Sequence, residues 1–81
     1  MKHPGKNISG PLIAARRKSH RPPLTQLDLS RRLKVAGVDL DRAAVAKIEN
    51  GLRGVLDYEL AGFARVLSVS VRKLLPERRR R

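Results

Sequence analysis

Short helical segments, each bounded by its own start and stop residues, dominate this chain of 81 residues. Most of the apolar repeats with helical spacing follow a good helix N-cap, and all but the fourth end at glycine or proline. No sustained alternation of apolar and polar residues predicts a strand, and Asn50-Gly51 follows a helical pattern. The chain is therefore predicted to be all-α, with five short helices in one domain.

The first helix is expected to begin near Gly10, because Pro11 suits the first helical position, where its missing N–H costs nothing. It must stop before Pro22 and Pro23, which cannot continue a helix. Its short apolar face is predicted to comprise Leu12, Ile13 and Ala15.

The second and third helices have the clearest boundaries. Thr25 is a good N-cap, and Asp28 three residues later approximates a capping box. Gly37 is expected to end this helix. Asp41 caps the third helix, which Asn50-Gly51 ends. The residues predicted to face the core are Leu29, Leu33 and Ala36 in the second helix and Val45 and Ile48 in the third.

The fourth helix is predicted to start at Asp57, and a short fifth helix is predicted between Ser70 and Pro76. The expected inward residues are Leu60, Phe63, Ala64 and Leu67 in the fourth helix, and Val71, Leu74 and Leu75 in the fifth.

Positive charge is concentrated at the two ends of the sequence. The formal net charge is +12, from 19 Lys and Arg against 7 Asp and Glu. Residues 1–34 carry +8, residues 35–71 carry −1 and residues 72–81 carry +5. We expect residues 1–9 to form a flexible arm, residues 10–76 the folded domain and residues 77–81 a disordered basic tail.

This charge predicts a polyanionic partner. Aromatic residues make up only 2% of the chain, which disfavours stacking on single-stranded bases and favours the backbone of a duplex. A single run of basic residues is usually only a solvent-exposed surface without a specific role. We prefer this interpretation for the four final arginines.

The sequence offers little for catalysis or metal binding. Cysteine is absent, and His3 and His20 are isolated, so neither a disulfide nor a metal site is expected. The sequence contains neither a nucleophile–base pair nor a glycine-rich phosphate loop, so an enzyme is not predicted. No cofactor is expected. No apolar run approaches a membrane span or the core of a signal peptide, which predicts a cytoplasmic protein. The expected duplex partner would place it at the nucleoid.

The second and third helices, joined by a turn that contains glycine, have the layout of a helix-turn-helix. Residues 24–30, 45–51 and 52–70 together resemble the XRE family of lambda repressor and Cro-like DNA-binding domains. The likeness covers about residues 10–76. Residues 35–41 are longer than the tight turn of compact members, which indicates a subgroup with an extended turn.

The resemblance implies a role for several side chains. The third helix matches the recognition helix, so Arg42, Ala43, Ala44 and Lys47 are expected to face the major groove. The resemblance also implies phosphate contacts for Gln26, Asn50 and Arg53, and a structural ion pair between Arg17 and Glu49.

Most of these residues also have an ordinary structural interpretation. Arg42 could form a weak surface pair instead of a contact to guanine, and Gln26 could simply be an exposed polar residue at a helix start. The two alanines could contact a thymine methyl or serve only as good helix formers. Lys47 favours phosphate over a base, because a flexible point charge reads sequence poorly.

Three hypotheses of function follow. The first is a sequence-specific regulator of double-stranded DNA, a repressor that binds a palindromic operator as a homodimer through residues near 67–75. The second is a protein-interaction module, such as an antitoxin that binds a toxin as well as DNA. The third is a non-specific architectural or RNA-binding protein, which would not need small outward residues on the third helix.

Overall fold

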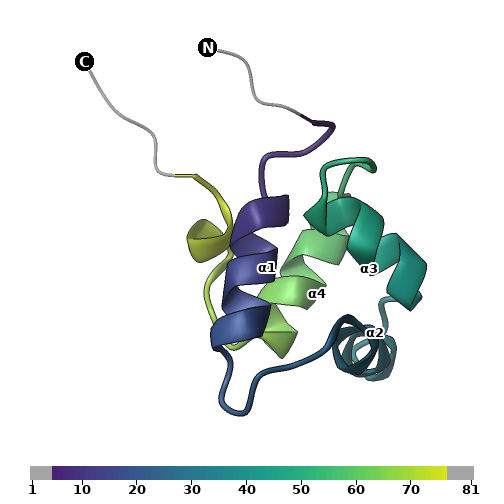
Figure 1. Cartoon of the computed structure of the whole chain (residues 1–81), viewed down its shortest axis with the longest axis vertical. Coiled ribbons are helices and arrows are strands. Elements are labelled where there is room, and N and C mark those ends of the chain that lie inside the picture. The colour runs from purple at the N-terminus through teal and green to yellow at the C-terminus, as the bar shows by residue number, and fades with distance from the viewer. Residues whose placement is uncertain (1–4, 77–81) are drawn as a thin grey trace.

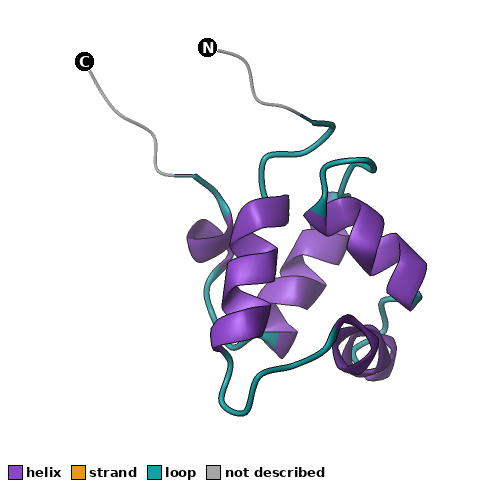
Figure 2. Ribbon diagram, viewed as in Figure 1, coloured by secondary structure: helices purple, strands orange, loops and turns teal. Residues whose placement is uncertain are grey.

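Four short α-helices and one turn of 3-10 helix make up the fold (Figure 1). A computed structural model describes residues 5–76. The elements in chain order are α1 (Gly10–Ser19), α2 (Gln26–Val35), α3 (Arg42–Glu49), α4 (Asp57–Val66) and the 3-10 helix η1 (Val71–Leu74). Residues 5–76 contain no strand, so the predicted all-α class is confirmed for this part of the chain (Figure 2).

The predicted fifth helix is a single 3-10 turn rather than an α-helix. Hydrogen bonds at its two ends join residues three apart, from Lys73 N–H to the Ser70 carbonyl and from Leu75 N–H to the Arg72 carbonyl. A segment of four residues is too short to propagate α-helical bonding, and the backbone is already extended at Leu75.

Local capping fixes where α2 and α3 begin. Thr25 Oγ1 accepts the Asp28 N–H at 3.0 Å, and the Asp28 carboxylate accepts the Thr25 N–H at 3.0 Å. These two bonds confirm the predicted capping box. At α3, Asp41 Oδ1 accepts the Ala44 N–H at 2.8 Å. Gly37 follows α2 with a φ of 92°, which satisfies the left-handed geometry of a helix end.

A side chain outside the helix caps α1. Asn7 Oδ1 accepts the N–H groups of Ser9 at 3.0 Å and Gly10 at 2.7 Å, while Ser9 itself makes no side-chain cap. The Lys6 N–H donates to the Gly51 carbonyl at 2.8 Å. The sequence analysis assigned residues 5–9 to a flexible arm, whereas the structure hydrogen-bonds them to the folded body. Residues 1–4 and 77–81 lie outside the described residues.

The core draws on every element. Phe63 and Leu74 are fully buried among residues from the other helices. Within α1, Ile13 is buried as expected but Ala15 is exposed. Within and after η1, only Leu74 faces inward, because Val71 and Leu75 are each 39% exposed. The buried apolar residues are Ile13, Leu24, Leu29, Leu33, Val38, Leu40, Val45, Ile48, Phe63, Ala64, Leu67 and Leu74.

Helix α3 lies at the edge of the fold and packs against both α1 and α2. Helix α4 packs against α2 and η1, and η1 packs against α1. In Figure 1, α1 and η1 lie on the left of the molecule and α3 lies on the right. No helix among residues 5–76 combines the length and apolarity needed to span a bilayer.

Candidate nucleic-acid interface

One face of α3 is open to solvent and carries small and basic side chains. Arg42, Ala43 and Lys47 are all exposed. Ala44, which was predicted to join them, is half-buried and packs against the core. It lies four residues before Ile48, and residues four apart share one face of a helix. The candidate reading surface of α3 therefore consists of Arg42, Ala43 and Lys47.

A buried ion pair fastens the end of α3 to α1. Arg17 donates from Nε to Glu49 Oε2 at 2.7 Å and from a terminal nitrogen to Glu49 Oε1 at 2.9 Å. The side chains are 12% and 4% exposed. Hydrogen bonding to Glu49 raises the pKa of Arg17, so the pair stays charged. Arg17 also donates to the Leu24 carbonyl at 3.0 Å, which ties the loop before α2 to the same point.

Gln26, the first residue of α2, is hydrogen-bonded to the ion pair of Arg17 with Glu49. Its Nε2 donates to Glu49 Oε1 at 3.0 Å. Three elements, α1, α2 and α3, thus meet at one carboxylate. The amide nitrogen of glutamine carries two N–H groups, so a second donor remains for another acceptor. Because Glu49 turns inward, the only acidic residue of α3 is neutralised on the side away from the exposed face.

Asn7 holds α3 from the other side. Its Nδ2 donates to the Ile48 carbonyl at 3.0 Å and to the Arg53 carbonyl at 2.7 Å. The same side chain caps α1, so one amide links the beginning of α1 with the end of α3. Gly10 permits this approach, because an added Cβ would lie 2.4 Å from the Ile48 carbonyl oxygen. The bonds of Asn7 to the end of α3 were not foreseen, since the Ile48 and Arg53 carbonyls lie more than forty positions away in the sequence.

Arg53 is engaged in an ion pair. Its guanidinium donates to Glu59 Oε1 at 2.9 Å and to Oε2 at 3.1 Å. The same carboxylate accepts the Leu56 N–H at 2.9 Å and so caps α4. Glu59 is almost fully buried, and the sequence analysis did not single it out. Its position three residues after a helix N-cap was the signal that could have identified it.

The ion pair of Arg53 with Glu59 predicts that the stability of the protein depends on pH. Hydrogen bonding to Arg53 holds the pKa of Glu59 below its ordinary value of 4.5. Because the pKa of Glu59 is lower in the folded state, its ionised form stabilises the fold at pH values above its ordinary pKa. This stabilisation is lost as the pH falls through the lowered pKa. We expect the urea midpoint to fall between about pH 5 and pH 3, and Glu59→Gln to flatten that decline.

The control for that titration is Asp57→Asn on the same helix, because Asp57 is exposed. Asp57→Asn leaves the Arg53–Glu59 pair intact, so the decline that Glu59→Gln flattens should still be present. Some dependence will remain in Glu59→Gln, since backbone and side-chain hydrogen bonds from Thr25 also lower the pKa of Asp28. An unaltered profile in Glu59→Gln would contradict the assignment.

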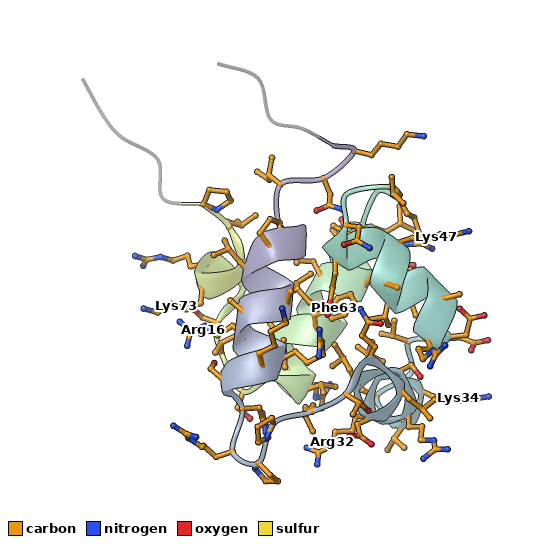
Figure 3. All side chains as sticks on the ribbon, in the orientation of Figure 1. Arg16, Arg32, Lys34, Lys47, Phe63 and Lys73 are labelled. Carbon is orange, nitrogen blue, oxygen red and sulfur yellow. The ribbon has the colours of Figure 1, made fainter. Side chains whose placement is uncertain are left out.

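Further cations surround the open face of α3. Arg31 and Lys34 of α2 are exposed, and Figure 3 shows Lys34 and Lys47 on the same side of the molecule. Asn50 follows α3 and is also exposed. Two exposed acids, Asp39 and Asp41, lie just before α3. An anion is therefore attracted to Lys47 and to the exposed cations of α2. The turn before α3 carries two acids and would repel it.

Among residues 5–76, no group of three His, Cys, Asp or Glu side chains could hold a metal ion. Comparisons of this chain with protein-family models, with curated proteins and with solved structures find no match.

Proposed function

We propose that the protein is a sequence-specific double-stranded DNA-binding regulator of the helix-turn-helix XRE type, with α3 as its recognition helix. The observation that carries the proposal is the open face of α3. That face presents Arg42, Ala43 and Lys47 to solvent, while the single acid of the helix is turned inward and paired. An exposed α-helix of this kind fits the major groove of B-DNA, which is about 12 Å wide.

Each exposed side chain has a role that its chemistry supports. The Arg42 guanidinium is a planar fork, which can donate two hydrogen bonds to O6 and N7 of one guanine. Ala43 allows the helix backbone to approach the base edges and can contact a thymine methyl group. Lys47 lies at the last turn of α3 and supplies a charge for the phosphate backbone.

Phosphate contacts are proposed for the residues around α3 rather than for α3 alone. Gln26 begins α2, where free N–H groups and the helix dipole favour an anion, and its second amide N–H is available. Asn50, Arg31 and Lys34 are exposed, and Figure 3 shows Lys34 on the same side of the molecule as Lys47. Arg53 belongs to this set as well, because its guanidinium carries five N–H donors, of which the Gly54 carbonyl and Glu59 accept three.

The ion pair of Arg17 with Glu49 and the side chain of Asn7 act as positioning groups in this proposal. Together they fix the C-terminal end of α3 relative to α1 and α2. A recognition helix must be held to within a fraction of an ångström for its contacts to discriminate between bases. A rigid α3 therefore supports sequence-specific binding more than charge-driven binding alone.

A homodimer on a palindromic operator is part of the proposal. A single short helix contacts few base pairs, so two half-sites are needed for useful discrimination. A repressor is the simplest regulator of this design, because occupation of an operator needs no further domain.

Selection of bound duplexes from a random library tests this function directly. We expect an inverted repeat to be enriched, with half-sites about one helical turn apart. In binding titrations, Arg42→Ala should cost about 1–3 kcal/mol on the selected site and relax preference at one position per half-site. Gln26→Ala should weaken all duplexes alike, because phosphate contacts carry no sequence information.

The matched control is Lys18→Ala, which removes one positive charge from an exposed position on α1. It should change neither the selected sequence nor the discrimination between sites. Equal retention of all library sequences would reject sequence-specific binding and favour a non-specific polycation. An identical, uniform effect of Arg42→Ala and Gln26→Ala would show that α3 does not read bases.

A further inference from the structure

A second basic surface lies on the side of the molecule opposite to α3. It consists of Arg16 on α1 and of Arg72 and Lys73 on η1, all of them exposed. Helices α1 and η1 pack against each other, which brings exposed cations of both elements to the same side of the molecule. Figure 3 shows Arg16 and Lys73 together on the left of the molecule, with Lys47 on the right. We refer to these three residues as the α1–η1 surface.

The cations of the α1–η1 surface are not neutralised within the described chain. Neither α1 nor η1 contains an acidic residue. By contrast, Arg17 is paired with Glu49 and Arg53 with Glu59. These are the two ion pairs among residues 5–76, and neither involves the α1–η1 surface. Like charges that share a surface without counter-charges create a positive potential, which attracts a polyanion.

A second copy of this chain is a poor occupant for the α1–η1 surface. A two-fold contact places the same patch of each subunit against the other, so the cations of the two copies would face one another. Like charges opposed across an interface cost several kcal/mol. The expected dimer contact near residues 67–75 therefore conflicts with the charge found there. A phosphate backbone supplies the missing counter-charge.

We propose that the α1–η1 surface binds the phosphate backbone of a second DNA duplex, so that one protein molecule bridges two DNA segments. This inference rests on the proposed function of α3, which would hold the first duplex. The body measures 23 by 21 Å across its shorter axes. Charges separated by more than about 8–10 Å of salt solution are largely screened. Because Arg16 and Lys73 lie on the opposite side of the body from Lys47, a duplex in contact with α3 leaves the α1–η1 surface free for another duplex (Figure 3).

A bridging assay tests the proposal with the full chain. A biotinylated duplex that carries the selected site is fixed to beads, and a labelled duplex without that site is offered in solution. Wild-type protein should retain the labelled duplex on the beads, and retention should fall steeply with salt. Arg16→Glu and Lys73→Glu should each reduce retention, and the double variant should abolish it. Binding of the double variant to the site-bearing duplex alone should persist.

Lys18→Glu is the matched control, because Lys18 lies about 200° around α1 from Arg16 and receives the same change of charge. It should bridge like wild type. No bridging by wild type, or unchanged bridging by the Arg16→Glu/Lys73→Glu variant, would overturn the inference while leaving single-duplex binding through α3 intact. Failure of the wild type to bind any duplex would instead reject the proposed function. Retention of anionic lipid vesicles, but not of the labelled duplex, would also overturn the inference and assign the surface to membranes.

Discussion

Replacing Glu49 with alanine is expected to destabilise the protein by about 3–5 kcal/mol. The Glu49 side chain is 4% exposed and accepts three hydrogen bonds, two from Arg17 and one from Gln26. Its removal strands the Arg17 guanidinium in a site that is itself 12% exposed. A domain of this size has a total stability of about 4–12 kcal/mol, so the loss is a large fraction of it. Urea denaturation followed by circular dichroism measures the effect.

The matched control for Glu49→Ala is Asp39→Ala, which removes an equal charge from an exposed position. Asp39→Ala should change the free energy of unfolding by about 0.5 kcal/mol or less. A double variant, Arg17→Met with Glu49→Leu, removes both charges and should recover much of the lost stability. If Glu49→Ala costs no more than Asp39→Ala, the ion pair does not hold α3 in place.

Phe63→Ala is expected to cost about 3–5 kcal/mol as well, because it removes the largest buried side chain of a small core. Phe63 is the only phenylalanine in the chain, and tryptophan is absent. It has the largest volume of the fully buried side chains, so its removal leaves a cavity between α4 and the remaining helices. The same urea titration measures this loss.

Tyr58 provides an unusually close control, because it is the only tyrosine, lies on the same helix and is 58% exposed. Tyr58→Ala should change the free energy of unfolding by about 0.5 kcal/mol or less. Comparable losses in Phe63→Ala and Tyr58→Ala would contradict the position of Phe63 at the centre of the core. Phe63→Leu should fall between them, since it leaves a smaller cavity than alanine does.

The candidate interface was predictable from the sequence only in part. Arg42, Ala43 and Lys47 are exposed on α3 as expected, because the apolar residues Val45 and Ile48 fix which face turns inward. Ala44 was misplaced, since alanine gives no sign of whether it faces the core or the solvent. Arg53 was expected at phosphate, and its ion pair with the buried Glu59 was not foreseen from the sequence.

The sequence by itself determined the all-α class and the boundaries of α2 and α3. These features depend on bonds between residues three or four positions apart, such as those of Thr25 with Asp28 and of Asp41 with Ala44. Interactions of such short range require only the local order of residues, and any chain with that order can form them.

Only the tertiary structure decided how α3 is held and which cations are left without a partner. The bonds of Asn7 with Ile48 and of Gln26 with Glu49 span 41 and 23 positions. Their geometry depends on how the helices pack, which no local pattern encodes. Packing likewise pairs Arg17 with an acid and leaves its neighbour Arg16 exposed beside Lys73. The sequence gives both arginines the same charge, and the fold alone assigns one to the interior and the other to a surface.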